Sequence, residues 1–334
     1  MIYPRLNRVR NGQRLSVQLV NGLIKRTEYA GDLLRQGKCL AGTDISVAQR
    51  YDGTTISGGG ESRILICGAR FASTAPFTRV PFIYDYSNNL YTDLQNIPKA
   101  MNDGIYAFGI HSGVMSGHFF EPLKGFGRGF VYSNNAFTII NEGGELEFNT
   151  LLYKNNGSLA VGYSDAPLNI DAAIIYSIST GTFSKKLLVD YQHTDIFENI
   201  ICGRANISGS FRGYTFDVQT NEIVSTFNYP AAQTTTAYGI YQNTIVGWYQ
   251  NFSQQARGYL YDGVNFSSHI HPDSVGSTRF YGIAGDFVVG SFVDGLAGGL
   301  RRGLIYNKKS ETYERLSHPS GQNTEFFGID KSFF

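Results

Sequence analysis

The chain has 334 residues, with 28 basic and 27 acidic side chains and a net charge of +1. This balance offers no basic surface for nucleic acid or for an anionic membrane, so neither is expected as a partner. Charged residues make up 16% of the chain and glycine occurs 39 times, a composition that favours an all-β protein with many short strands and turns.

The N-terminal segment begins with a polar, basic stretch, Met1 to Arg5, that lacks the apolar core of a secretory signal. No later run approaches the ~18 apolar residues of a membrane helix. The sequence therefore predicts no signal peptide and no membrane segment, and favours the cytoplasm while leaving the location open. Residues 25–38 read as a short helix, whereas Leu19 to Gly22 has the form of a strand.

A repeat begins after this segment, anchored by a glycine that follows two apolar or small residues. The anchor glycines are Gly68, Gly117, Gly162, Gly203, Gly247 and Gly290. They are separated by 49, 45, 41, 44 and 43 residues, about the length of one four-stranded propeller blade. Between successive anchors lies a strand with aromatic or apolar residues at alternate positions, such as Tyr259-Leu260-Tyr261.

The fold predicted from this repeat is an all-β β-propeller of four-stranded blades. A seventh first strand, Glu325 to Ile329, has no strands after it, and Leu19 to Gly22 lies one blade length before Gly68. We therefore predict seven blades, the closing blade being shared by the N- and C-termini. Six blades plus an N-terminal arm is the alternative, because residues 25–38 resemble a helix more than a strand.

The domain prediction is one propeller spanning residues 1–334. Residues 1–52 would complete the closing blade, residues 53–324 would form six repeat blades, and residues 325–334 would supply the closing strand. Cys67 and Cys202 hold equivalent positions in distant blades, so we expect buried thiols and no disulfide between them.

The order of motifs in the clearest copies, Tyr238-Gly239-Ile240, Val246-Gly247-Trp248 and Arg257-Gly258-Tyr259, is similar to that of bacterial HAF-type repeats. The resemblance covers residues 60–330 and is sharpest over 236–318. It implies the propeller fold and rests on structural glycines and aromatic residues. It implies no particular activity.

Connector lengths predict which end of the ring is open. Ile283 to Phe287 leaves room only for a tight turn, whereas Val293 to Arg301 and Pro272 to Arg279 are longer and polar. The longer connections join second to third strands and one blade to the next. In propellers these gather on the usual ligand-binding face.

Candidate site residues are those that differ between blades. The position after the anchor glycine reads Ala69, His118, Tyr163, Arg204, Trp248 and Ser291. These side chains could surround one ligand, or they could pack between blades and only fill space. Trp248 and Tyr163 are predicted to stack against the ligand, and Tyr249 is a further ligand-binding candidate.

Acid–base candidates lie near the same face. Asp165 with Asp171 could divide acid and base roles, and His193 with Asp195 could form a carboxylate–imidazole pair, although charges in loops are more often simply solvated. His269 and His271 share a strand face, but no third ligand can be named, so no metal is predicted. Motifs for phosphate binding, zinc or a serine nucleophile are missing, and no cofactor is predicted.

Three functions stay open at this point. The first is a ligand-binding propeller with one central site for a small polar or aromatic molecule or a glycan. The second is an enzyme, a hydrolase, lyase or cyclase, in which His118, His193, Asp165, Asp171 and Arg204 supply proton transfer and charge stabilisation. The third is a module that binds a protein partner.

Overall fold

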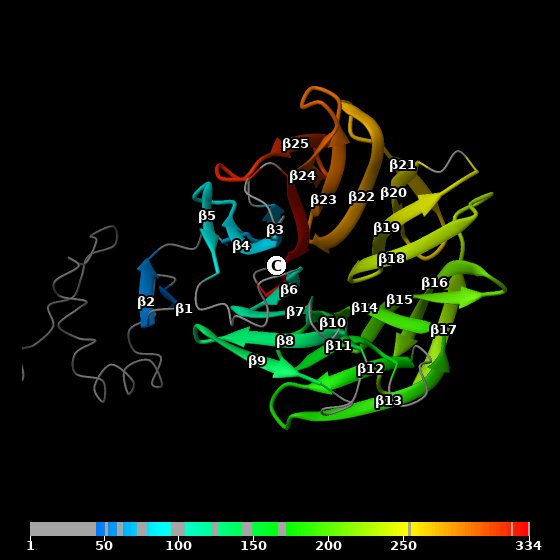
Figure 1. The fold of residues 1–334 in the computed structure, drawn as a ribbon, viewed down its shortest axis with the longest axis horizontal. Helices are drawn as coiled ribbons and strands as arrows, with labels where there is room; N and C mark the ends of the chain where they lie inside the picture. The colour runs from blue at the N-terminus through cyan, green and yellow to red at the C-terminus, as the bar shows by residue number, and fades with distance from the viewer. Residues whose placement is uncertain are drawn as a thin grey trace, which may run out of the picture. The chain divides into compact units, whose positions relative to one another are not determined.

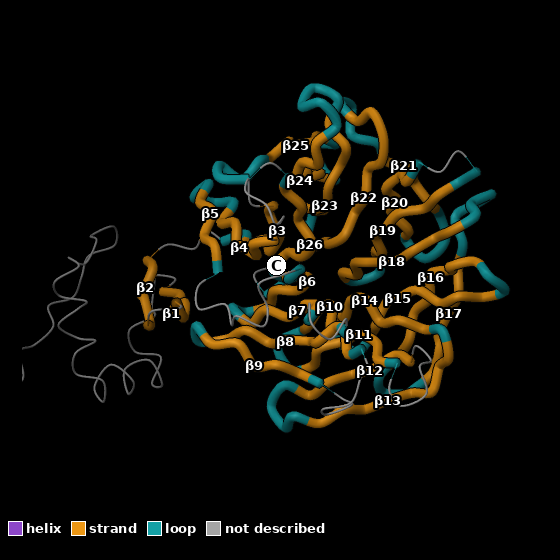
Figure 2. The backbone as a smooth tube through the Cα atoms, in the orientation of Figure 1, coloured by secondary structure: helices purple, strands orange, loops and turns teal. Residues whose placement is uncertain are grey.

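The fold is described from a computed structural model. The described residues are 45–50, 53–58, 63–71, 79–94, 104–121, 126–141, 149–165, 172–252, 255–321 and 323–332. Within them every regular element is a β-strand, and Figure 2 shows these strands in orange, joined by teal loops. In this part of the chain we find no helix with the length and apolar character needed to cross a membrane.

The chain divides into two units, residues 1–61 and 62–334. In the first unit, β1 (Ile45–Arg50) and β2 (Gly53–Gly58) pair as an antiparallel hairpin. The helix predicted over residues 25–38 and the strand predicted at Leu19 to Gly22 lie outside the described residues.

The second unit is a ring of six four-stranded antiparallel blades around one axis (Figure 1). The first strand of each blade is innermost and the fourth is outermost. The first three blades, each from the axis outward, are β26, β3, β4 and β5 (Thr324–Ile329, Leu65–Phe71, Arg79–Asp85, Leu90–Asp93), β6 to β9 (Tyr106–His111, Val114–Phe120, Gly127–Ser133, Ala136–Ile140) and β10 to β13 (Thr150–Asn155, Leu159–Ser164, Ala172–Ser177, Thr182–Val189). The other three are β14 to β17 (Tyr191–Phe197, Ile200–Ile207, Ser210–Asp217, Glu222–Phe227), β18 to β21 (Thr234–Tyr241, Thr244–Gln250, Ala256–Tyr261, Phe266–His269) and β22 to β25 (Ser274–Ala284, Phe287–Asp294, Leu300–Asn307, Thr312–Leu316).

The blade count corrects the main prediction. The ring has six blades, the number given by the alternative prediction, and not the seven of the main prediction. β26, which has the form of a first strand, does not begin a seventh blade. It pairs with β3, Phe326 lying opposite Gly68, and so supplies the first strand of the Gly68 blade. This pairing of the two ends of the unit closes the ring.

The anchor glycines lie on second strands where the first strand of the same blade comes closest. A Cβ atom on Gly117 would lie 1.9 Å from the carbonyl oxygen of Tyr106, and one on Gly247 would lie 2.0 Å from that of Thr236. The other four anchors show the same approach, at 1.9 to 2.3 Å. No larger residue fits at these points, so the repeat in the sequence reflects a backbone contact repeated in every blade.

Each first strand carries a β-bulge opposite the anchor glycine. After the bulge, four blades have a glycine: Gly109, Gly239, Gly282 and Gly328. These glycines lie close to the neighbouring first strand, and a Cβ atom on Gly282 would be 3.3 Å from the Cα atom of Gly328. The other two blades have Lys154 and Asp195 at this position.

The two ends of the ring differ in their connections. At one end lie the tight turns within blades, and Lys308 there donates its backbone N–H to the carbonyl oxygen of Asp286 at 2.8 Å. At the other end lie the longer connections predicted to be open, and Gly295 donates to the carbonyl oxygen of Asp273 at 3.0 Å. We term these the hairpin end and the loop end.

Candidate functional site

The residues that follow the anchor glycines form one layer on the loop-end side of the bulges. In the ladders, Tyr106 pairs with His118, Thr236 with Trp248 and Gln192 with Arg204. Each residue of the layer therefore lies opposite the equivalent residue of the first strand in its own blade.

An aromatic cluster fills the axis beside this layer. Its buried aromatic members are Phe108, Tyr153, Tyr281 and Phe327. Tyr163 and Trp248 pack against it and are half-buried. The ring of His118 stacks on that of Phe108, with 5.1 Å between centroids. The structure thus brings together three of the predicted residues, His118, Tyr163 and Trp248, from three different blades.

Two arginines flank a single carboxylate next to this cluster. Arg79 Nη2 lies 3.8 Å from Glu325 Oε2, and Arg301 Nε lies 3.7 Å from Glu325 Oε1. The guanidinium of Arg79 also lies over the ring of Tyr106, 3.9 Å from its centroid. Arg79 and Arg301 are partly exposed, whereas Glu325 is buried.

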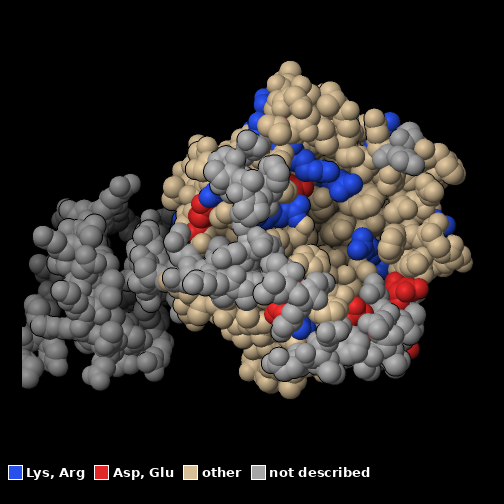
Figure 3. Space-filling view, in the orientation of Figure 1, with Lys and Arg blue, Asp and Glu red and all other residues tan. Residues whose placement is uncertain are grey.

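A third arginine, Arg279, lies over the ring of Trp248, 4.9 Å from its centroid. It also acts on Tyr281: burial, together with the nearby Glu325, raises the pKa of that hydroxyl to about 12, and Arg279 opposes the shift. Arg279 and Glu325 therefore belong to one electrostatic group. We term Arg79, Arg279, Arg301, Glu325 and Trp248 the arginine funnel. Two of its three arginines, Arg79 and Arg301, lie next to its one carboxylate. Figure 3 shows Lys and Arg side chains around a central hollow.

Several donors of the funnel are buried without a hydrogen-bond partner. They are Nε of Arg79, Nε of Arg279, Nη1 of Arg301 and Nε1 of Trp248. Burial lowers the pKa of Arg79, and the nearby Glu325 only partly opposes this. Because buried N–H groups without acceptors cost free energy, the funnel is a site where an added acceptor would be stabilising.

Two predicted site residues lie elsewhere. His193, on β14, is buried, and its Nδ1 lies 2.6 Å from the hydroxyl of Tyr214. Tyr249, on β19, stacks on Tyr229 with 3.6 Å between ring centroids. Asp195 binds lysine ammonium groups, so His193 and Asp195 have different partners.

The remaining candidates have local partners. Arg204 donates from Nε to Gln192 Oε1 at 2.8 Å. Asp165 accepts hydrogen bonds from the backbone and side-chain amides of Asn149, at 2.5 and 2.6 Å. Asp171 lies outside the described residues, so its pairing with Asp165 stays a prediction.

His269 and His271 do not share a ligand position. His269 Nε2 lies 2.9 Å from Ser267 Oγ, whereas His271 stacks on Phe292 with 3.7 Å between centroids. Among the described residues, no three His, Cys, Asp or Glu side chains are grouped in a way that could hold a metal ion.

The buried histidines predict a loss of stability in acid. Burial lowers the pKa of His118 to about 4 and that of His193 to about 3, so both are neutral in the folded protein at neutral pH. In the unfolded chain both titrate near ~6.5, and the unfolded state then binds more protons below that pH. We expect the free energy of unfolding to fall by up to about 1.4 kcal/mol per pH unit for each histidine as the pH drops below about 6.5. Urea unfolding between about pH 7 and about pH 5 measures this slope, and an unchanged slope in His193→Gln would contradict the assignment to His193.

A buried charge cluster lies on the hairpin side of the aromatic cluster. It consists of Lys154, Asp195 and Lys331, all buried. Asp195 Oδ2 accepts from Lys331 Nζ at 2.6 Å and lies 3.5 Å from Lys154 Nζ. Lys154 also donates to the carbonyl oxygens of Tyr238, at 2.5 Å, and Tyr281. We term these three residues the axial charge cluster, which occupies the axis between the two ends of the ring.

Sequence reasoning missed the arginines of the funnel and the role of Lys154. One signal was available: across the six first strands, the position two residues before the bulge is charged only at Arg279 and Glu325. A second signal was Lys154 itself, which occupies the position after the bulge, where four of the six blades have a glycine. Arg79 and Arg301 have no comparable signal, because both contact Glu325 from strands far away in the chain: Arg79 lies on the third strand of the same blade, and Arg301 on the third strand of the neighbouring blade.

Comparison with known proteins supports the fold alone. No family model matches the chain, and no curated protein is similar to it in sequence. The structure is similar to that of TolB from Acinetobacter baumannii, with a TM-score of 0.59 and 11% identity over 81% of this chain and 68% of that one. It is also similar to a putative TolB from Agrobacterium tumefaciens, with a TM-score of 0.54 and 11% identity over 80% of this chain and 99% of that one. The propeller implied by the resemblance to HAF-type repeats is confirmed as a fold, and the repeat family itself is not.

Proposed function

We propose that the protein is a binding propeller whose arginine funnel takes one small ligand that carries a carboxylate or another oxyanion. The observation that carries the proposal is the set of buried donors without acceptors on Arg79, Arg279, Arg301 and Trp248. An oxyanion is the acceptor that guanidinium groups bind best, because two parallel N–H groups can each donate to one oxygen.

The charge of the funnel favours the same ligand class. Its three guanidinium groups carry three positive charges, and Glu325 balances one of them. Arg79 and Arg279 lie over aromatic rings, and these contacts restrict their guanidinium groups before a ligand arrives. Less conformational entropy is then lost on binding.

The body of the ligand would contact aromatic side chains. Trp248 of the funnel and Tyr163 both pack against the aromatic cluster and are half-buried, and aromatic side chains are suited to contact a sugar ring or an aromatic ring. Arg279 and Glu325 occupy a first-strand position that is uncharged in the other four blades, so this arrangement of charges occurs once around the axis. One central site is therefore proposed, with a sugar acid or an aromatic acid as the ligand.

The fluorescence of Trp248 tests the proposal directly, because it is the one tryptophan of the chain. Titrations would use glucuronate and benzoate, each against its neutral counterpart, glucose and benzamide. We expect the acids to bind at least about tenfold more tightly than the neutral compounds, and the difference to shrink at high salt. Arg279→Gln or Arg301→Gln should weaken binding about 10- to 100-fold.

Lys309→Gln is the matched control, since it removes one positive charge from an exposed turn. It should leave the affinity within about twofold of the unchanged protein. Equal binding of acids and neutral compounds, or equal losses in Lys309→Gln and Arg279→Gln, would overturn the proposal.

A protein partner is the second candidate, supported by exposed apolar residues at the loop end. Phe252, Val275 and Leu296 are 84%, 64% and 73% exposed. Val275 lies against the chain next to Leu296, because a Cβ atom on Gly295 would be 2.4 Å from Val275 Cγ1. The partner would place an acidic side chain in the funnel and apolar side chains on this patch.

Selection from a random peptide library tests the second candidate. Peptides that combine acidic and apolar residues, and that lose binding to both Arg279→Gln and Leu296→Ser, would support it. Binders that are insensitive to both substitutions would contradict it.

A further inference from the structure

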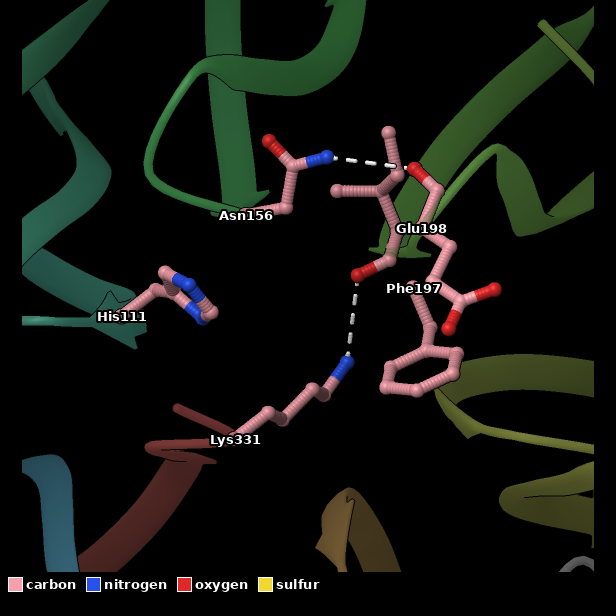
Figure 4. A pocket seen from close by; sticks show the side chains of 6 residues that line it. His111, Asn156, Phe197, Glu198 and Lys331 are labelled. Carbon is pink, nitrogen blue, oxygen red and sulfur yellow. Dashed lines mark hydrogen bonds between the residues drawn. The ribbon is translucent and has the colours of Figure 1, made fainter. Parts of the chain in front are cut away.

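A second cavity lies at the hairpin end, on the far side of the axial charge cluster from the arginine funnel. Its volume is about 230 Å³. It is lined by His111, Asn156, Ile196, Phe197, Glu198 and Lys331. Figure 4 shows the side chains of His111 and Lys331 reaching toward the same open space, with Asn156 and Phe197 at its other sides. A liquid water molecule takes roughly 30 Å³, so the cavity has room for a small organic molecule.

Lys331 provides a buried positive charge at this cavity. Its side chain is 7% exposed, and Nζ donates to Asp195 Oδ2 at 2.6 Å and to the carbonyl oxygen of Ile196 at 3.3 Å. An ammonium group has three N–H donors, so one remains for a molecule in the cavity. Asn156 uses one of the two N–H groups of its amide in a hydrogen bond to the carbonyl oxygen of Glu198, so the amide has one further donor.

His111 lies on another side of the cavity, with the buried carboxylate of Asp330 behind it. Its Nδ1 is buried without a hydrogen-bond partner and lies 4.0 Å from Asp330 Oδ1. Asp330 is fully buried, and its Oδ2 also lacks a partner. A proton on His111 would give this carboxylate a cation to interact with, while the opposite edge of the ring would offer an N–H to the cavity.

Three carboxylates and two ammonium groups lie around His111. Lys331, Asp330 and Asp195 act on it directly, and Lys154 and Glu198 lie beyond them in the axial cluster and at the rim. Burial is the main cause that lowers the pKa of His111, and Asp330 and Asp195 oppose it. The lowered pKa favours the neutral imidazole at neutral pH, and an anion next to it would favour the imidazolium.

We propose that this cavity binds a short-chain monocarboxylate, with its carboxylate between Lys331 and a protonated His111 and its carbon chain against Ile196 and Phe197. The two cations supply the hydrogen-bond donors, and the two apolar residues bury the chain. Binding takes up one proton, and Asp330 stabilises the imidazolium from behind. This site is independent of the arginine funnel, from which the axial charge cluster separates it.

The test uses butyrate as the probe and butyramide as its uncharged counterpart. The ring signals of the six histidines are followed by NMR, with His111→Gln identifying the signal of His111. We expect butyrate to shift this signal toward the protonated position in a saturable way, and butyramide to leave it unchanged. The affinity for butyrate should fall about tenfold per pH unit above neutral pH, and this dependence should be lost in His111→Gln.

Four further variants locate the site. Phe197→Trp should fill the cavity and weaken butyrate binding at least about tenfold, whereas Phe252→Trp, at an exposed phenylalanine of the loop end, should have no effect. Lys331→Met should abolish binding if the variant folds, and Phe197→Trp decides the question if it does not. Arg279→Gln should leave the His111 shift intact even where it removes ligand binding at the funnel.

The proposal would be overturned by equal binding of butyrate and butyramide, or by a His111 signal that does not respond. It would also be overturned by a butyrate response that disappears in Arg279→Gln and persists in Phe197→Trp, since the anion would then be in the funnel.

Discussion

Asp195→Asn is expected to lower the free energy of unfolding by about 3–5 kcal/mol, because it leaves two buried cations without their shared counterion. Lys331 Nζ and Lys154 Nζ lie 2.6 and 3.5 Å from Asp195 Oδ2. The same oxygen accepts the backbone N–H of Ile240 at 2.9 Å, so the carboxylate also joins two neighbouring blades. Urea unfolding at neutral pH measures the loss.

Glu222→Gln is the matched control for this substitution. It also removes one negative charge, but from an exposed position on the outermost strand β17, and should change stability by less than about 0.5 kcal/mol. Adding Lys331→Met to Asp195→Asn should restore part of the loss, because only one unpaired cation then remains. If Asp195→Asn and Glu222→Gln lowered the free energy of unfolding by similar amounts, the axial charge cluster would not hold the blades together.

Gly247→Ala is expected to destabilise the protein by about 3 kcal/mol or more, because the added methyl group has no room. Its carbon would lie 2.0 Å from the carbonyl oxygen of Thr236 and 3.0 Å from the Cα atom of Ala237. Both atoms belong to the backbone of β18, so the first strand itself must move. The measurement is again urea unfolding, with the signal of Trp248 as the local probe.

Gly263→Ala separates this steric effect from the ordinary cost of replacing a glycine. Gly263 has a φ of 97° in an exposed turn, and a Cβ atom there would meet nothing within 4 Å. Its substitution should cost about 1 kcal/mol through backbone strain alone. If both variants lost the same amount, the close approach of first and second strands would not explain the anchor glycines.

Local features of the fold were predictable from the sequence. The anchor glycines predicted the repeat, and the connector between Ile283 and Phe287 is a tight turn, as expected. Cys67 and Cys202 are free and buried, which confirms that prediction, whereas Cys39 lies outside the described residues. These features depend on residues of a single blade, so their signal repeats at one blade length.

The blade count was not predictable in the same way. The sequence shows that Glu325 to Ile329 has the form of a first strand, but not which second strand it joins. β26 has an equally good pattern whether it begins a seventh blade or completes the first, and only its pairing with β3 decides between them. That pairing joins segments from opposite ends of the propeller unit, and no local pattern records it.

The candidate site was also predictable only in part. The sequence identified the layer after the anchor glycines, and His118, Tyr163 and Trp248 do meet at the aromatic cluster. The partners of Glu325 came only from the structure, since Arg79, on β4, and Arg301, on β24, reach it from strands far apart in the chain.

The sequence by itself therefore determined that this protein is a ring of similar blades, because the close contact of first and second strands demands a glycine in every copy. The tertiary structure decided how many blades close the ring, that an arginine funnel occupies the loop end, and that Lys154, Asp195 and Lys331 occupy the axis. The physical reason is that Arg301 with Glu325, and the three residues of the axial charge cluster, interact across blades, at distances that are set only when the ring has closed.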